Sequence, residues 1–199
     1  MLIRPHDAST DDTQWRSFVR QQGFGHFAVN ASDVPVVVPT QFVVVEDQVF
    51  FHLAKANPVF AALQARPRAV LSIAGDWAYI PGAWKAIGDE DPTLGIPTTY
   101  YGAVQLSGTV TVTDEAEEIA AILRRQLADV EPGGGLQDPL VHRKKFLAIR
   151  GIRMTIDDVR AKFKYGGNAD AAHREAVAKR LRARGGPGDV AAANRVRQD

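Results

Sequence analysis

The stretch "FFHLAKANPVFAAL", residues 50–63, changes from strand to helix within a few residues. Two aromatic residues and His52 belong to a β-like run, and Asn57 and Pro58 precede apolar residues at helical spacing. Asn is a common helix cap because its side-chain oxygen accepts a hydrogen bond from first-turn amides, and Pro at the first helical position sacrifices no needed N–H. A helix N-terminus flanked by Lys55 and His52 also suits an anion such as phosphate. The residues alone leave both interpretations open.

The sequence around this stretch predicts an α+β fold. Val-rich runs separated by "NASDV" indicate a hairpin, and Trp15, Phe18 and Val19 share one face of a short helix. Gly102 and Gly108 lie inside a strong strand pattern and indicate a close approach or a bulge. Strands separated by helices at some connections, without regular alternation, favour an antiparallel barrel with peripheral helices over a doubly wound sheet. We expect strands at 25–30, 35–45, 47–54, 68–80 and 100–112, the strand at 68–80 being interrupted near Gly75 and Asp76. Residues 149–163 are expected to form a final strand that runs into a short turn or helix. Helices are expected at 10–22, 58–65, 114–129 and 170–184, with a basic helical stretch after Leu140.

Charge is distributed unevenly along the 199 residues. Residues 1–140 hold 9 Lys and Arg against 17 Asp and Glu, whereas residues 141–199 hold 15 against 6. A basic C-terminal part suggests a polyanion, the acidic face of a partner, or complementarity within the chain. No run approaches the ~20 apolar residues of a membrane helix, and the N-terminus lacks the apolar core of a signal peptide. We therefore expect a cytoplasmic protein without membrane association.

Motifs for catalysis without a cofactor are absent from the sequence. There is no G-x-S-x-G, no G-x-G-x-x-G that opens a βα unit and no cysteine. The five histidines show no metal-ligand spacing, so we predict no metal site. We assign no catalytic residue, and any chemistry would have to come from a cofactor. The polar loop 86–97, rich in Gly and Pro, could act as a lid or as a switch.

Four ordered motifs resemble those of the PaiB-type family, described as FMN-binding negative transcriptional regulators. They are "HLAKANP" (52–58), "AYIPGAW" (78–84), "GIPTTYYGAVQLSGTV" (95–110) and "IRGIRMTIDDVRAKFKYGGN" (149–168), and the resemblance runs from about residue 1 to 175. The residues that match the family's motif positions are His52, Ala54, Asn57, Pro58, Tyr79, Ile80, Trp84, Pro97, Thr98, Tyr101, Gly108, Gly151, Lys164 and Asn168.

This resemblance implies an FMN-binding split barrel: an antiparallel split β-barrel with peripheral helices that forms a homodimer and holds FMN at the subunit interface. Residues 1–168 would form this domain, and residues 169–199 a basic helix and a frayed tail. The FMN phosphate would lie at the strand-to-helix turn, with Lys55 as a point charge, Asn57 as cap and the helix amides as donors. The cofactor-binding candidates are His52, Lys55, Asn57, Tyr79, Trp84, Thr98, Thr99, Tyr101 and Lys164.

Each candidate also has an ordinary structural interpretation. His52 could be hydrogen-bonded within the fold, Lys55 could be a solvated loop residue, and the aromatic residues could pack instead of stacking on a flavin. Thr98 suits a flavin edge atom but could equally be a turn residue. Basic residues of the 170–184 helix could contact DNA or a protein partner, or could lie on a solvated face.

Three motifs depart from the family pattern. Residues 38–41 read Val-Pro-Thr-Gln instead of Thr-His-Leu-Pro, Thr99 and Tyr100 replace Trp-Asn, and residues 165–167 read Tyr-Gly-Gly instead of Leu-Ser-Gln. Three hypotheses follow. The chain is a flavin-binding sensor or negative transcriptional regulator, an oxidoreductase that uses FMN or a deazaflavin, or a ligand-free dimer that acts through interactions.

Overall fold

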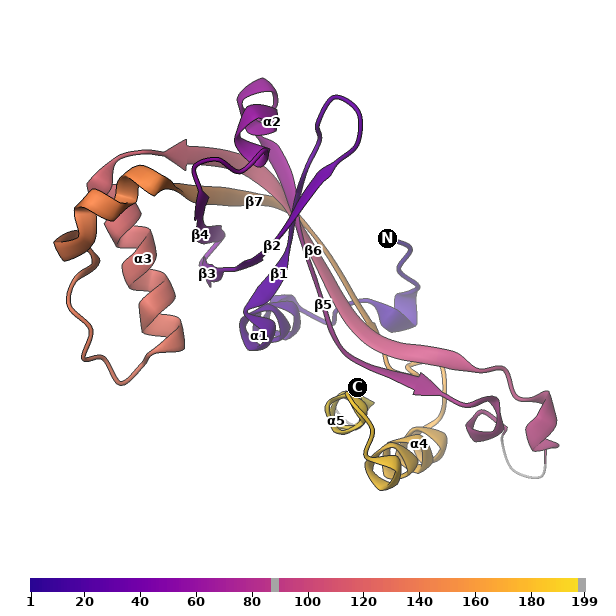
Figure 1. Ribbon diagram of the computed structural model, residues 1–199. Helices are drawn as coiled ribbons and strands as arrows, with labels where there is room; N and C mark the ends of the chain where they lie inside the picture. The colour runs from indigo at the N-terminus through magenta and orange to yellow at the C-terminus, as the bar shows by residue number, and fades with distance from the viewer. Residues whose placement is uncertain (87–89, 197–199) are drawn as a thin grey trace. The chain divides into compact units, whose positions relative to one another are not determined.

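The computed structural model describes residues 1–86 and 90–196 (Figure 1). Residues 87–89 of the predicted 86–97 loop and residues 197–199 of the expected tail lie outside the described residues. The described chain is an α+β protein with a seven-stranded sheet in the order β2-β1-β5-β6-β7-β4-β3. The strands are β1 (Phe24–Val29), β2 (Val36–Gln41), β3 (Val43–Val45), β4 (Gln48–Ala54), β5 (Arg68–Ile80), β6 (Thr98–Thr113) and β7 (Ile149–Lys164).

Helices and single helical turns occupy the connections and the two ends of the described chain. The α-helices are α1 (Asp12–Gln22), α2 (Val59–Ala65), α3 (Ala116–Val130), α4 (Ala171–Arg184) and α5 (Asp189–Val196). The 3-10 segments are η1 (Pro5–Asp7), η2 (Gly82–Trp84), η3 (Pro92–Leu94) and η4 (Pro139–Ala148). The α+β class, the antiparallel pairing and the peripheral helices agree with the sequence prediction.

The Val-rich run 35–45, predicted as one strand, is two strands. β2 pairs with β1, whereas β3 pairs with β4 at the other end of the strand order. Between them Phe42 is 2 % exposed, and its N–H donates to the carbonyl oxygen of Gly23. Burial of this ring redirects the chain, and Glu46, with φ at 52°, then turns β3 back into β4. One residue therefore connects the two edge strands of the sheet.

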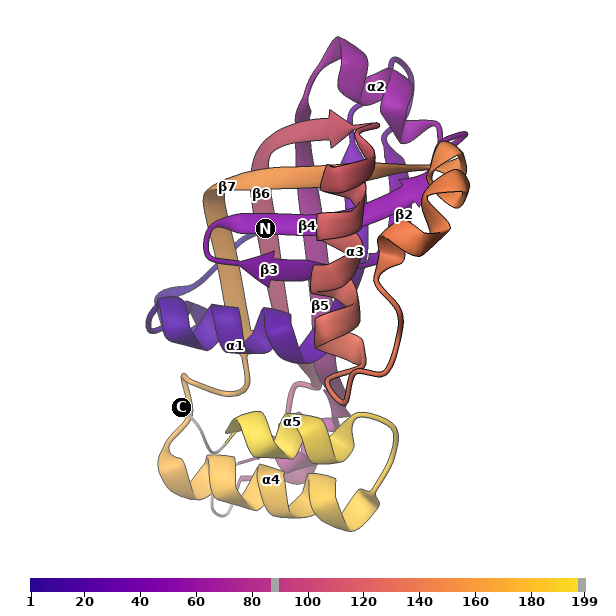
Figure 2. The same cartoon turned by 90° about the vertical axis from the view of Figure 1, so that its left-hand side faces the viewer.

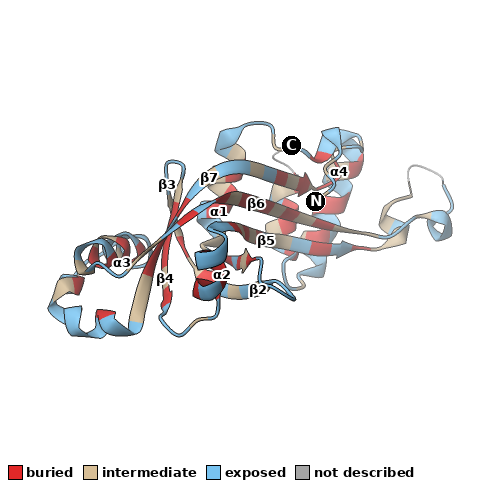
Figure 3. Ribbon diagram, turned by 90° about the horizontal axis from the view of Figure 1, so that it is seen from above, coloured by how far each residue is buried: buried red, intermediate tan, exposed pale blue. Residues whose placement is uncertain are grey.

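The chain divides into two compact units, each with its own core. The first comprises residues 1–18, 74–104 and 161–199, and the second comprises residues 19–73 and 105–160. In the second unit Phe27 and Phe51 pack edge to face, and α3 lies across β4 and β3 (Figure 2). Helix α3 buries Ile119 and Ile122 while its other side is exposed, as Figure 3 shows. The acids in its first turn agree with the sequence prediction of this helix.

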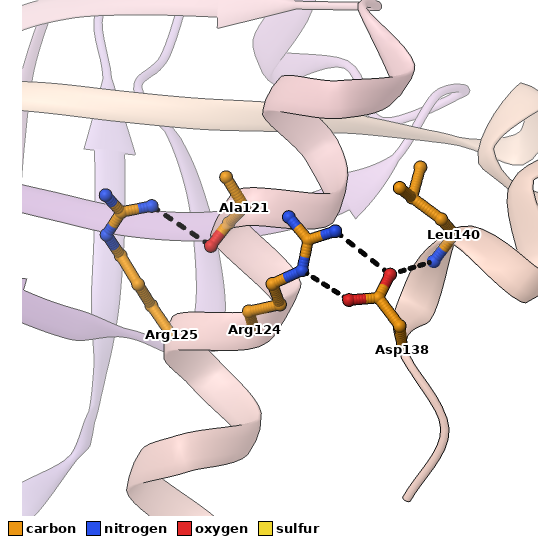
Figure 4. Close-up of polar contacts among 5 residues, drawn as sticks. All are labelled: Ala121, Arg124, Arg125, Asp138 and Leu140. Carbon is orange, nitrogen blue, oxygen red and sulfur yellow. Dashed lines mark hydrogen bonds and ion pairs between the residues drawn. The ribbon is translucent and has the colours of Figure 1, made fainter.

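The basic stretch after Leu140 is η4, a 3-10 segment rather than an α-helix. Asp138 begins it, because its carboxylate accepts the N–H of Leu140 at 2.9 Å. The same carboxylate accepts two hydrogen bonds from Arg124 of α3, at 2.6 and 3.0 Å (Figure 4). Nearby on α3, Arg125 donates back to the carbonyl oxygen of Ala121. The Arg124–Asp138 pair thus joins η4 to α3.

In the first unit, α4 and α5 form a helical hairpin, although the sequence analysis expected the end of the chain to fray. Gly185 takes a left-handed conformation, with φ at 62°, and ends α4. Buried Asp189 then accepts hydrogen bonds from Arg184 and from the N–H of Gly186. Val196 is 1 % exposed, and Arg195 pairs with Asp76 of β5 at 2.8 Å. These contacts order a segment whose Ala- and Gly-rich sequence gives little local signal.

Candidate functional site

The turn between β4 and α2 is built around Asn57. Its Oδ1 accepts the N–H of Val59 at 3.2 Å, as predicted for a cap. Beside it, the Lys55 Nζ lies 3.2 Å from an Asp114 oxygen, and that carboxylate also accepts a hydrogen bond from Arg150 Nε at 3.0 Å. Hydrogen bonds from Arg150 and then from Lys55 hold the pKa of Asp114 below its usual value. Two cations therefore share one carboxylate, so this ion cluster carries a net positive charge.

A cavity of ≈ 370 Å³ adjoins this ion cluster. Asp114 and Arg150 form its polar wall, and the guanidinium of Arg150 also lies over the ring of Phe60 at 5.1 Å. The remaining lining is mostly aliphatic. The turn thus combines a cap, surplus positive charge and an adjacent cavity, which are the elements of an anion site.

His52 is part of a partly buried polar chain in the second unit. Its Nδ1 lies 2.7 Å from Gln126 Oε1, and Gln126 Nε2 donates to Gln41 Oε1 at 2.5 Å. Because the Gln126 oxygen faces His52, Nδ1 carries the proton of the neutral ring and Nε2 is left as an acceptor. Gln41 Nε2 is buried without a hydrogen-bond partner among the described residues. An unpartnered buried donor is costly unless a ligand or water accepts its hydrogen bond.

The other six candidates lie in the first unit, where the structure brings two of them together. Lys164 Nζ donates to Thr98 Oγ1 at 2.6 Å. Tyr101 lies beneath Lys162 Nζ, 5.6 Å from its ring centre, and Trp84 beneath the guanidinium of Arg184 at 5.0 Å. Tyr79 is 50 % exposed. Thr99 is partly exposed on β6.

Two glycines fix the path of the chain through the "AYIPGAW" and "GIP" motifs. A Cβ on Gly82 would collide with the carbonyl oxygen of Gly95, and a Cβ on Gly95 with the carbonyl oxygen of Gly82. The backbones of η2 and of the segment after η3 therefore pass in direct contact. This contact places the chain that leads into Thr98.

Sequence reasoning missed Asp114, Arg150 and Gln126 as partners of its candidates. A signal existed for Gln126, because Ile119, Ile122 and Gln126 share one helical face and an uncharged polar residue on an apolar face requires a partner. Asp114 was interpreted as a residue of the first helical turn. The structure instead places it before α3, bonded to Lys55 and Arg150.

The basic residues of α4 have different surroundings. Arg174, Arg182 and Arg184 donate hydrogen bonds within the first unit, whereas Lys179 and Arg180 are exposed. Within residues 1–86 and 90–196, no group of three or more His, Asp or Glu side chains is placed to hold a metal ion. No helix in the same described ranges is long and apolar enough to cross a membrane.

Comparison with known families gives one match over most of the chain. Residues 1–158 match the family described as "Putative FMN-binding domain". The chain belongs to this family. FMN is accordingly its cofactor, and no curated protein matches the sequence.

Solved structures with the same fold include several flavoproteins. The FAD and heme binding protein from Mycobacterium smegmatis superposes with a TM-score of 0.63 at 18% identity, covering 83% of this chain and 77% of that protein. The flavocytochrome Anf3 from Azotobacter vinelandii gives 0.61 at 19% identity, covering 83% of this chain and 73% of the other. A conserved hypothetical protein from Mycobacterium tuberculosis gives 0.59 at 13% identity, covering 82% and 91%. At these identities the likeness establishes the fold.

The groups present in the chain fit FMN. A phosphate group binds to cations such as Lys55 and Arg150. In this structure the two cations share a single carboxylate, that of Asp114. The polar edge of an isoalloxazine ring accepts hydrogen bonds, and Gln41 Nε2 is a buried donor without a partner among the described residues. When bound, FMN supplies redox chemistry that no side chain of this protein provides.

Proposed function

We propose that this protein is an FMN-occupied sensor of the PaiB type, a negative transcriptional regulator whose state depends on flavin binding. The observation that carries the proposal is the Lys55–Asp114–Arg150 cluster at the turn that bears the "HLAKANP" motif. The FMN phosphate would compete with Asp114 for the two cations. Because Asp114 lies two residues before the start of α3, its release would couple occupancy to the start of that helix.

Roles for the remaining candidates follow from their chemistry. In the second unit, His52 is proposed to present its Nε2 acceptor toward the cofactor, and Asn57 to hold the turn. In the first unit, Tyr79, Trp84 and Tyr101 are proposed as aromatic contacts, and Thr98, Thr99 and Lys164 as polar contacts of a flavin. Residues 1–168 are the proposed cofactor domain.

We further propose that the sheet closes as a split barrel and that two chains form a homodimer. Support for closure comes from Phe42, the residue that links the edge strands β2 and β3. Sedimentation of the purified protein would measure the dimer, and a monomer at micromolar concentration would contradict it. Lys179 and Arg180 are exposed on α4 and are proposed to reach DNA or a protein partner, which a gel-shift assay of their alanine variants would test.

The second candidate function is an oxidoreductase that uses FMN or a deazaflavin. One observation favours it: the Gln126 contact leaves His52 Nε2 as an acceptor, which could receive a substrate proton. The two functions differ in turnover. Steady consumption of NADPH or NADH by FMN-loaded protein with an added acceptor would favour the enzyme, and its absence the sensor.

The phosphate assignment is tested by titrating the protein with FMN and with riboflavin while following flavin fluorescence. We expect saturable quenching by FMN and weaker binding of riboflavin, which lacks the phosphate. Lys55→Ala should weaken FMN binding about fivefold to tenfold and should leave riboflavin binding unchanged. The loss is moderate because water partly screens the charge of a half-exposed ammonium.

Lys144→Ala serves as the matched control, because it removes the same charge from an exposed position of η4. It should bind FMN like the unchanged protein. Equal loss of FMN and riboflavin affinity in Lys55→Ala would contradict the phosphate contact, and a colourless protein that ignores FMN would contradict the sensor proposal itself.

A further inference from the structure

A second group of cations gathers in the first unit, outside the β4–α2 turn. Lys164 at the end of β7 donates to Thr98 Oγ1 at 2.6 Å. Lys85, which follows η2, lies near enough to Lys164 that burial and then repulsion between the two ammonium groups lower its pKa. Repulsion between two ammonium groups costs free energy, and a bound anion would reduce this cost. The pair therefore favours binding of a negatively charged group.

His173 of α4 belongs to the same group. Its side chain is buried, at 8 % exposed, and Nε2 has no hydrogen-bond partner among the described residues. Burial, and then the positive charge of Lys85, lower the pKa of this imidazole. The nearest acid is Asp170, whose carboxylate accepts the backbone N–H of His173 and caps α4.

Tyr100 supplies a further unpartnered polar group. It lies two positions from Thr98 on β6, so the two side chains share one face of the strand. Tyr100 is 1 % exposed, and its hydroxyl has no hydrogen-bond partner among the described residues. Gly166, at φ 90°, leaves the space that the hydroxyl occupies, since a Cβ there would collide with it. Buried polar groups without partners are uncommon in folded proteins.

We propose that Lys85, Lys164 and His173, the lysine–histidine cluster, bind a phosphate-type dianion in the first unit, with Thr98 and Tyr100 as additional hydrogen-bonding groups. A dianion would relieve the repulsion between the lysines and accept a hydrogen bond from His173 Nε2 in its imidazolium form. Two sources carry this chemistry: the phosphate of FMN itself, and a separate phosphorylated small molecule. The proposal stands whether or not the FMN phosphate binds at the β4–α2 turn.

Sulfate is the first probe, because it remains a dianion across the pH range in which histidine titrates. Binding to the full chain is measured by calorimetry at constant ionic strength, with chloride as the reference salt. We expect saturable sulfate binding that strengthens as the pH falls through the pKa of His173. Lys85 and Arg180 oppose protonation of this imidazole and Asp170 favours it, so bound sulfate should raise the pKa of His173 in an NMR titration.

Variants locate the site. Lys85→Gln and Lys164→Gln should each weaken sulfate binding about tenfold or more, because each variant loses a charge-assisted hydrogen bond to the anion. Lys144→Gln removes the same charge from an exposed position of η4, outside the first unit, and should leave the affinity unchanged. The Lys85 side chain has no hydrogen bond or ion pair within the described residues, and its backbone N–H bond to Gly82 survives the substitution, so the variant is expected to fold normally, which circular dichroism verifies.

Sulfate binding to FMN-saturated protein distinguishes the FMN phosphate from a separate phosphorylated ligand. Loss of sulfate binding in the presence of FMN but not of riboflavin assigns the cluster to the flavin phosphate. Unchanged sulfate binding assigns it to a separate phosphorylated ligand. Sulfate that binds no better than chloride, or equal weakening in Lys144→Gln, overturns the site, and this result is independent of whether FMN binds.

Discussion

Gly108 lies where β6 passes against the backbone of β7. A Cβ at this position would collide with the carbonyl oxygen of Thr155 and would lie 2.9 Å from Met154 Cγ. A side chain can rotate away from such a contact, but a paired strand backbone cannot move without losing its hydrogen bonds. The requirement for glycine is therefore steric at this residue.

Replacement of Gly108 by Ala should lower the free energy of unfolding by about 1–3 kcal/mol, the range for overpacked interiors. Urea unfolding followed by circular dichroism measures the change. Gly133→Ala is the matched control, because no atom lies within 4 Å of a Cβ there, and it should stay within about 0.5 kcal/mol. Similar losses in both variants would show that the contact with β7 is not what requires glycine at 108.

Individual residues were predictable where the cause is local. The Asn57 cap and the close approach at Gly108 follow from neighbouring residues, and both are confirmed. The partners of Lys55 and His52 were not predictable, because Asp114 and Gln126 reach them through sheet pairing and the docking of α3. Contacts between residues that are far apart in the sequence cannot be predicted from local patterns, because many distant acids or amides could be the partner equally well.

At the scale of elements, two aspartates form similar bonds in different surroundings. Asp189 at the start of α5 accepts two hydrogen bonds from Arg184 and is 1 % exposed, whereas Asp138 accepts two from Arg124 at an exposed position. The bond from Arg184 is the main cause that lowers the pKa of Asp189 in the folded protein. A lowered carboxylate pKa stabilises the fold at neutral pH, and this stabilisation is lost as the pH falls through the lowered value.

Asp189→Asn should therefore destabilise the protein at pH 7 by about 1.5–3 kcal/mol, as expected when a buried charged hydrogen bond is lost. The deficit should shrink as the pH falls toward and below the ordinary carboxyl pKa. Thermal unfolding over a series of pH values measures it. Asp138→Asn should change the melting temperature much less, and equal effects would contradict the role assigned to burial.

The predicted strand and helix boundaries differ from the observed ones for physical reasons. The uninterrupted valines at 36–38 and 43–45 indicate one strand, and the division at Phe42 arises from which neighbours each half pairs with. The apolar residues of α5 are mostly alanines, which give little local signal, so its order depends also on Asp189 and on the Arg195–Asp76 pair. Helix α3, with acids first and a clear apolar face, was predictable because its signals are internal.

At the scale of the whole molecule, the proposed domain 1–168 omits the α4–α5 hairpin. Val177 and Leu181 of α4 are fully buried, and Arg195 pairs with Asp76 of β5. A chain that ends at Asn168 would expose the surface beneath these side chains. We expect it to melt at least about 5 °C below the full chain, since 1 kcal/mol shifts a protein of this size by about 2–4 °C.

The same truncated chain should bind FMN with the affinity of the full chain if residues 1–168 are the cofactor domain. Differential scanning calorimetry and the fluorescence titration measure the two properties separately. An unchanged melting temperature would show that the hairpin adds no stability. Lost FMN binding by a truncated chain that remains folded would show that the cofactor domain extends beyond residue 168.

The mutual contact of Gly82 and Gly95 has a consequence for how this protein can evolve. Each carbonyl oxygen occupies the space that a side chain at the other position would need, so enlarging one residue cannot be offset by changing its partner. A mutational scan should accept glycine alone at both positions, and the two sites should show no compensatory covariation. The pair is thus a fixed signature that drifting sequences of this fold would retain after the residues around it have diverged.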